Sequence, residues 1–156
     1  MNHQTFLLEA VNLANENVKT GTGGPFGAII VKDGKVIGRG VNRVTGQLDP
    51  TAHAEVQAIR DACQNLKDFQ LKDCILYTSC EPCPMCFGAI YWARIKEVFY
   101  AGSKHDAKAA GFDDAFIYEE LRVDRTDKKI PFYHVKLETE ENPFTLWRDA
   151  SIKIEY

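Results

Sequence analysis

Residues 74–102, CILYTSCEPCPMCFGAIYWARIKEVFYAG, predict a strand, a helix and a second strand in direct succession. The apolar runs at residues 74–79 and 97–102 have the length of strands, and the segment 83–94 between them is expected to be helical. A crossover of this kind favours parallel neighbours in one sheet. The stretch therefore predicts an α/β fold.

The segments on either side fit the same arrangement. Residues 26–42 predict a β-hairpin, because the dipeptide Asp33-Gly34 suits a type I′ turn, in which both central residues need a positive φ. The hairpin supplies an antiparallel pair and the crossover a parallel one, so we expect a layered α/β domain with a mixed sheet.

The remaining elements follow from helical or alternating periodicity. A helix at 49–66 has Thr51 or Asp49 available as its N-cap. The other elements are expected as helices at 6–18, 105–121 and 144–153 and as a strand at 131–137.

Composition places the chain among ordinary globular proteins. Its 156 residues fit one domain, residues 1–156, with 45% hydrophobic and 26% charged residues. A net charge of -3 gives no basic footprint for a nucleic-acid backbone, and no apolar run approaches the roughly 20 residues that span a bilayer. The first residues lack the pattern of a signal peptide, and the five cysteines are an odd number. We therefore expect reduced thiols and a cytoplasmic location.

Three of the five cysteines, Cys80, Cys83 and Cys86, fall within one short stretch. They can form a thioredoxin-like redox pair, part of a structural zinc site or part of a catalytic zinc site. A structural site needs four protein ligands, and the sequence offers no second C-x-x-C pair. Cys63 and Cys74 are isolated and are expected in the core.

His53 and Glu55 decide between these readings. Both lie at the start of the expected helix 49–66, where they can flank an atom placed over the helix end. The helix that starts at Cys83 brings a second N-terminus, whose dipole favours thiolate. One imidazole and two thiolates leave a fourth position open on zinc, as in catalytic sites.

The two motifs together are typical of zinc deaminases. The signature H-x-E followed by P-C-x-x-C reads here as His53-Ala54-Glu55 and residues 82–86, PCPMC. The expected ligands of one Zn²⁺ are His53, Cys83 and Cys86, and Glu55 is the expected catalytic residue. Cys80 is then a packing residue.

At these residues the sequence resembles the cytidine deaminase-like superfamily, and within it the short, zinc-dependent bacterial guanine deaminases. The resemblance extends over GGPFGAIIVKDG, NRVTGQLDPTAHAEVQAIR, LYTSCEPCPMCFGAIYWARI and AGFDDAFIY to the terminal tyrosine. It implies a three-layer α/β/α fold with a mixed five-stranded sheet. It also implies a homodimer with a shared active site, in which residues 140–156 form a segment exchanged with the partner subunit.

The resemblance further implies the reaction. Guanine and water would give xanthine and ammonia, with zinc supplying an activated water near neutral pH. Glu55 would take the proton of that water, deliver it to a ring nitrogen and help to protonate the departing ammonia.

For the substrate contacts, the residues alone leave two readings open. Asn42 can hydrogen-bond a base edge or serve as a turn residue, and Phe26 can form an apolar wall or part of the core. One of Asp113 and Asp114 is expected to cap the next helix, and the resemblance gives the substrate role to Asp114. The full set of substrate contacts that it implies is Phe26, Asn42, Ala54, Asp114 and Tyr156.

Three other functions remain open at this stage. A tRNA adenosine deaminase would carry nearly the same motifs, but it needs a basic surface, and the only basic cluster, residues 121–129, is interleaved with aspartates. A different small base, such as cytosine, is the second alternative. A zinc-stabilised interaction module is the third, although such a module has no use for Glu55.

Overall fold

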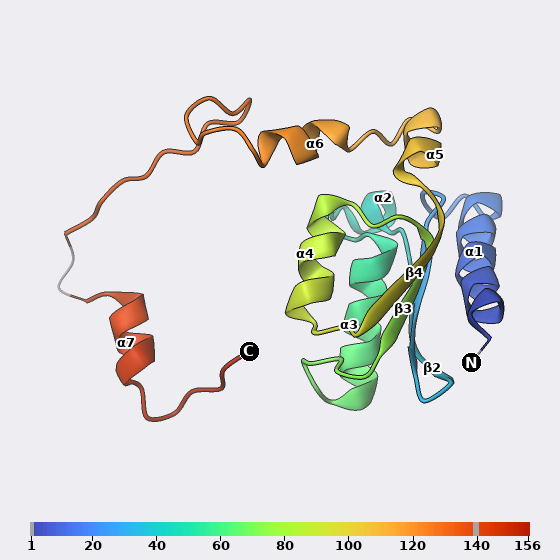
Figure 1. Ribbon diagram of the computed structural model, residues 1–156, viewed down its shortest axis with the longest axis horizontal. Coiled ribbons are helices and arrows are strands. Elements are labelled where there is room, and N and C mark those ends of the chain that lie inside the picture. Colours follow the sequence, from blue (N-terminus) through green and yellow to red (C-terminus); the bar gives the residue numbers. More distant parts are fainter. Residues whose placement is uncertain (1, 139–140) are drawn as a thin grey trace. The chain divides into compact units, whose positions relative to one another are not determined.

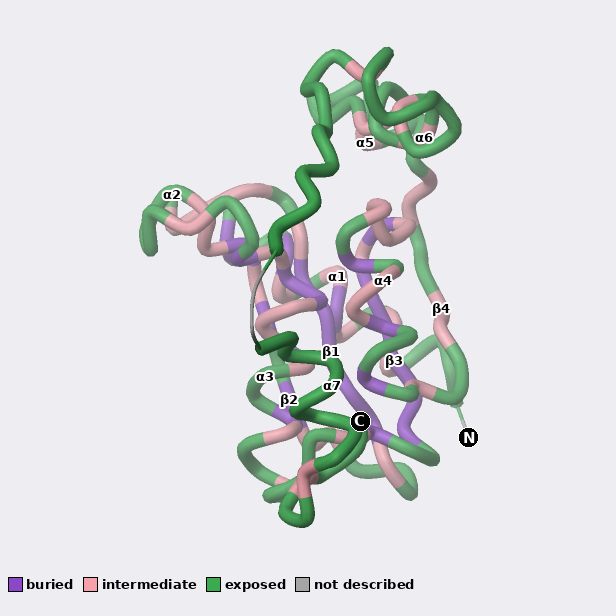
Figure 2. Tube along the Cα trace, turned by 90° about the vertical axis from the view of Figure 1, so that its left-hand side faces the viewer, coloured by how far each residue is buried: buried purple, intermediate pink, exposed green. Residues whose placement is uncertain are grey.

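The computed structural model describes residues 2–138 and 141–156 (Figure 1). The chain divides into two compact units, one that ends at Ala115 and one that spans Phe116–Tyr156. None of the described residues of the second unit is buried (Figure 2). Among the described residues, no helix is both long and apolar enough to cross a membrane.

A mixed sheet forms the centre of the first unit. Its strands are β1 (Gly27–Lys32), β2 (Lys35–Val41), β3 (Ile75–Cys80) and β4 (Glu97–Gly102). They lie in the order β2-β1-β3-β4, with β1 antiparallel to both β2 and β3 and with β3 parallel to β4. Asp33 and Gly34 have φ values of 49° and 76°, which confirms the turn expected for the hairpin. The parallel β3–β4 pair confirms the crossover.

The expected fifth strand is absent from the described residues, and the expectation of a five-stranded sheet is wrong here: the sheet has four strands. Residues 131–137 alternate in polarity but have no regular structure, and Phe132, Tyr133 and Val135 are exposed. A strand is stabilised by the ladder of hydrogen bonds to its neighbour, and no described strand pairs with this segment. Alternation alone does not provide that neighbour.

Helices cover both faces of the sheet and give the three layers of the expected α/β/α fold (Figure 1). The helices concerned are α1 (His3–Lys19) on one face and α3 (Ala54–Leu66) and α4 (Pro84–Trp92) on the other. Successive residues of β1 serve opposite cores, because side chains alternate along a strand. Ala28 and Ile30 pack towards α3 and α4, whereas Ile29 and Val31 pack towards α1.

A glycine in β2 sets how closely α3 approaches the sheet. A Cβ atom added to Gly40 would lie 2.1 Å from the carbonyl oxygen of Ala54 and 2.4 Å from the backbone nitrogen of Ala58. Only a residue without a side chain allows this approach. The first turn of α3 is thereby fixed against β2, and this turn carries the His53-Ala54-Glu55 motif.

The expected helical stretch 105–121 is interrupted. It forms α5 (Lys104–Ala109) and α6 (Ala115–Glu120), with Gly111 between them at a φ of 93°. Two further short helices are α2 (Val44–Gln47), which follows β2, and α7 (Pro143–Asp149). The interruption leaves Asp113 and Asp114 in a loop.

Candidate metal centre and active site

The two zinc motifs lie at the N-termini of α3 and α4. His53 is the N-cap of α3 and Cys83 is the N-cap of α4, and neither side chain caps its helix by a hydrogen bond. The expected cap of α3 by Thr51 or Asp49 is therefore wrong. Instead, the N–H of Thr51 donates to Oδ1 of Asp49 at 2.8 Å within the preceding loop. The side chain of His53, at the cap position, is therefore available to bind a metal ion.

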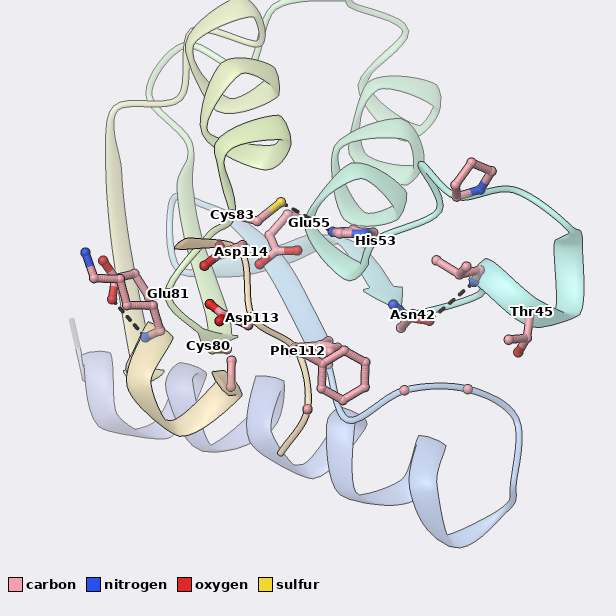
Figure 3. Close-up of a pocket in the computed structure, with 18 of the residues that line it drawn as sticks. Asn42, Thr45, His53, Glu55, Cys80, Glu81, Cys83, Phe112, Asp113 and Asp114 are labelled. Carbon is pink, nitrogen blue, oxygen red and sulfur yellow. Dashed lines mark hydrogen bonds between the residues drawn. The ribbon is translucent and has the colours of Figure 1, made fainter. Parts of the chain in front are cut away.

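Three potential donor atoms converge at these helix ends, and Figure 3 shows two of the residues, His53 and Cys83. His53 Nδ1 lies 3.5 Å from Cys83 Sγ and 3.5 Å from Cys86 Sγ. The donor atoms of the three residues lie within 4.8 Å of one another, and no other cluster of this kind occurs among the described residues. In a tetrahedral site with usual Zn–N and Zn–S bonds, the nitrogen and sulfur atoms are about 3.6 Å apart. The arrangement thus fits zinc with a fourth position open.

The pKa values of Cys83 and Cys86 differ in a way that favours cation binding. A hydrogen bond from Cys86, assisted by His53, lowers the pKa of Cys83 to about 4. The same shared hydrogen bond, together with burial, raises the pKa of Cys86. Without a cation the pair therefore carries one negative charge and one proton, and metal binding releases that proton.

Cys80 is set apart from this pair. Its Sγ donates to the carbonyl oxygen of Ser103 at 3.5 Å, and burial raises the pKa of its thiol to about 11. Cys80 is also absent from the cluster of donor atoms formed by His53, Cys83 and Cys86. The structure thus agrees with the expectation that Cys80 packs beside the site.

Glu55 places a carboxylate next to the donor atoms. Its side chain is 5% exposed and accepts a hydrogen bond from Thr78 Oγ1 at 2.8 Å and one from Cys86 Sγ at 3.4 Å. Burial raises the pKa of Glu55, whereas the bonds from Thr78 and Cys86 oppose the shift. The carboxylate is fixed in orientation and suited to accept a proton.

Thr78 is part of the site, although no sequence motif includes it. It is fully buried on β3 and shares the sheet face of Leu76, which packs against α3 and α4. In the sequence, the role of Thr78 is indicated only by its being a polar residue on the inward face of a buried strand. Its partner, Glu55, is distant in sequence.

A cavity of about 720 Å³ opens beside the donor atoms. It collects residues from the loop after α1, the segment after β2, the starts of α3 and α4, the end of β3 and the loop between α5 and α6. Among its lining residues are Phe26, Asn42, His53, Glu55, Cys83, Phe112 and Asp114 (Figure 3). No sequence pattern points to Phe112, whose ring meets that of Phe26 edge-on at a centroid distance of 5.0 Å.

The two neighbouring aspartates have different surroundings. Asp113 lines the cavity as well, but its carboxylate accepts the N–H of Ala115, the first residue of α6, at 3.0 Å and pairs with Lys108 at 3.2 Å. Asp114 lines the cavity, and burial and the nearby Cys83 thiolate raise the pKa of its carboxyl. Asp114 is therefore free to meet a ligand while Asp113 is occupied.

The other two expected substrate contacts, Ala54 and Tyr156, remain predictions. Ala54 is fully buried beneath Gly40 and is not among the lining residues. Tyr156 belongs to the second unit and is exposed, and its role stays a prediction.

Comparison with known proteins gives a family and several relatives. Residues 1–102 match the cytidine and deoxycytidylate deaminase zinc-binding region. Over 156 residues the chain is 61% identical to guanine deaminase of Bacillus subtilis, and the match covers 100% of both proteins. An X-ray structure of that enzyme superimposes with a TM-score of 0.97, covering 100% of this chain and 99% of the other.

More distant relatives divide between two substrates. A structure of guanine deaminase from Nitrosomonas europaea is 34% identical, with a TM-score of 0.66 over 70% of this chain and 63% of that one. A tRNA-specific adenosine deaminase of Buchnera aphidicola is 46% identical over 88 residues, which are 56% of this chain and 58% of the relative. The chain thus shares its full length with the Bacillus enzyme and about half with the tRNA enzyme.

Proposed function

This chain belongs to the family defined by the cytidine and deoxycytidylate deaminase zinc-binding region, and we propose that, within this family, it catalyses the hydrolytic deamination of guanine. One water and one guanine give xanthine and ammonia. The observation that carries the proposal is the similarity over the full length to a guanine deaminase. The metal centre and the cavity supply the chemistry.

The site residues divide the work of the reaction. His53, Cys83 and Cys86 would hold the zinc, which supplies a Lewis acid that lowers the pKa of a water molecule. Glu55 accepts the proton of that water, transfers it to a ring nitrogen of the base and assists the departure of ammonia. Its carboxylate lies 3.4 Å from one of the donor sulfurs and lines the cavity, so it would lie beside both the zinc and a base bound there.

Substrate selection would fall to the cavity wall. Asp114 offers carboxylate oxygens to the ring N–H of guanine, and a charged acceptor makes strong hydrogen bonds of this kind. Asn42 accepts the N–H of Val44 through Oδ1 at 3.3 Å, so its Nδ2 donor remains for an acceptor on the base (Figure 3). Phe26, braced by Phe112, forms an apolar wall.

Ammonia release tests the proposal. The zinc-loaded protein would be incubated with guanine, adenine, cytosine, their nucleosides and a tRNA anticodon stem-loop. We expect turnover of guanine above all others. Turnover of the stem-loop alone would show that the substrate is adenosine in tRNA and not guanine. Zinc binding without any ammonia release would indicate an interaction module.

Asp114→Asn is expected to raise KM for guanine by about 30-fold, because a charge-assisted bond becomes a neutral one with the wrong donor pattern. Asp113→Asn is the matched control, since this neighbour also lines the cavity but its carboxylate is already engaged by the N–H of Ala115 and by Lys108. Steady-state kinetics of both variants checks the assignment. Equal effects of the two substitutions would contradict it.

Thr78→Val is expected to lower kcat by about 10-fold with unchanged zinc content, because the Glu55 carboxylate loses a hydrogen bond that orients it. Thr78→Ser restores the hydroxyl and should regain most of the rate. Wild-type kcat in the valine variant would show that the bond has no role in catalysis.

We further propose a homodimer in which each active site uses the C-terminal segment of the partner subunit. Residue 140, where the exchanged segment was expected to begin, lies outside the described residues. On α4, Phe87, Tyr91 and Trp92 are 55%, 64% and 63% exposed. Large apolar side chains gathered on one helix favour contact with another protein surface. Residues 131–137, which pair with no described strand, likewise favour pairing with another chain.

Complementation distinguishes a partner's Tyr156 from the chain's own. A Glu55→Gln chain would be co-expressed with a chain that lacks Tyr156, and the mixed dimer isolated by two affinity tags. Exchange predicts that one of its two sites is complete, so that about half of the wild-type activity returns. Activity no higher than in the two parent dimers would contradict exchange.

We propose a cytoplasmic location and no nucleic-acid partner. All five cysteines are free thiols in the structure, as a reducing compartment allows, and zinc thiolates need the reduced form. The net charge of -3 gives no attraction for RNA.

A further inference from the structure

Asn17, near the end of α1, is a buried polar residue outside the cavity. It is 4% exposed and does not line the cavity. Its Nδ2 group donates to two carbonyl oxygens, that of Gly24 at 2.8 Å and that of Asn42 at 3.0 Å. Both hydrogens of one amide group are thus used to join two segments that are separate in the chain.

Both of these segments form the cavity wall. The loop after α1 contributes Gly23, Gly24 and Phe26, and the segment after β2 contributes Asn42. The N–H of Asn42 also donates to the carbonyl oxygen of Phe26 at 3.1 Å. The relative position of the apolar wall and the Asn42 amide is therefore held by the end of the β1–β2 ladder, where Gly27 pairs with Val41, and by Asn17, which adds a link through a side chain.

The two segments approach each other closely at this link. A Cβ atom added to Gly23 would lie 2.2 Å from the carbonyl oxygen of Asn42 and 2.9 Å from Nδ2 of Asn17. The N–H of Thr22 donates to the carbonyl oxygen of Asn17 at 3.0 Å, so the same residue also anchors the start of the loop. A bulkier or differently bonded side chain at either position would separate the two walls.

We propose that Asn17 is a positioning residue for substrate binding, which holds the donor of Asn42 and the wall formed by Phe26 at the spacing that the base requires. The inference rests on the proposed function of the cavity, because it deepens how that cavity selects its base. Asn17 does not touch the reacting atoms, so its effect should appear in substrate affinity and pass through Asn42.

A double-mutant cycle tests this coupling. Asn17→Ala should raise KM for guanine by about 10-fold, with kcat within about threefold of the wild type and with the zinc content unchanged. In the Asn42→Ala background the same substitution should raise KM by less than about threefold, because the group that it positions is gone. Binding of xanthine, measured by calorimetry, should show the same pattern without turnover.

Asn65→Ala is the matched control. Asn65 also donates through Nδ2 to a strand carbonyl, that of Ile37 at 2.8 Å, but it lies at an exposed site away from the cavity. KM and xanthine binding should stay at the wild-type values. A similar rise of KM in this variant would overturn the proposal.

Gly23→Ala tests the same spacing if Asn17→Ala does not fold. Its methyl group should push the loop away from Asn42 and raise KM to a similar degree. If the KM increases caused by Asn17→Ala and Asn42→Ala simply multiply in the double variant, the two residues act independently and the proposal is overturned. A lower kcat with unchanged KM would also overturn it. The wild type decides the proposed function separately: if it converts another base, the cycle is run on that base.

Discussion

Glu55→Gln is expected to bind one zinc per chain, as the wild type does, and to lose about 10³-fold in kcat for guanine. Glutamine keeps the shape of the side chain and can still accept the hydrogen bond from Thr78. It cannot accept the proton of the activated water. Metal analysis and steady-state kinetics on the same preparation check both parts of this prediction.

Asp61→Asn provides the matched control for this substitution. Asp61 lies farther along α3, outside the main cavity, and accepts the backbone N–H of Arg39 at 2.9 Å. The same change from carboxylate to amide should leave kcat nearly unchanged there. Retained turnover in Glu55→Gln would contradict the assignment of the proton carrier, and lost zinc would make Glu55 a ligand.

Cys83→Ala is expected to lose the zinc and, with it, at least about 10³-fold in kcat/KM, because several kcal/mol of transition-state stabilisation depend on the metal. Cys83 holds the low-pKa thiolate of the pair, and its neighbour Cys86 and His53 lie within 3.5 Å of each other. Two remaining ligands bind zinc weakly. Elemental analysis after dialysis against a weak chelator measures the loss.

Cys80→Ser is the control for the same stretch. The thiol of Cys80 is bonded to Ser103 and lies outside the cluster of donor atoms, so the variant should keep one zinc per chain. Zinc loss in this variant equal to that in Cys83→Ala would contradict the ligand set. It would show that Cys80 belongs to the metal centre.

The parts of the site that the sequence predicts are local. His53 and Glu55 share one helix start, and Cys83 and Cys86 share another, so their spacing in the chain fixes their geometry. The cap of α3 was predicted wrongly for a related reason. Propensity favours Thr51 or Asp49 as caps, but His53, an expected metal ligand, occupies the cap position. Functional sites often break local rules in this way.

The parts that the sequence does not predict depend on distant contacts. Thr78 meets Glu55 and Asn17 meets Asn42 only after β3 and α1 are packed on the fold. The strand expected at 131–137 has a suitable pattern but no neighbour among the described strands. A pattern within one segment shows which face is apolar, whereas pairing is decided by the rest of the molecule.

Deamination of guanine in ¹⁸O-labelled water tests the central claim most directly. The zinc-loaded protein would be mixed with guanine, and the product and the ammonia would be measured by mass spectrometry and by enzymatic assay. The account predicts xanthine with one labelled oxygen at the carbon that carried the amino group, together with one ammonia for each xanthine. Guanine that remains unchanged in the presence of fully zinc-loaded protein would contradict it.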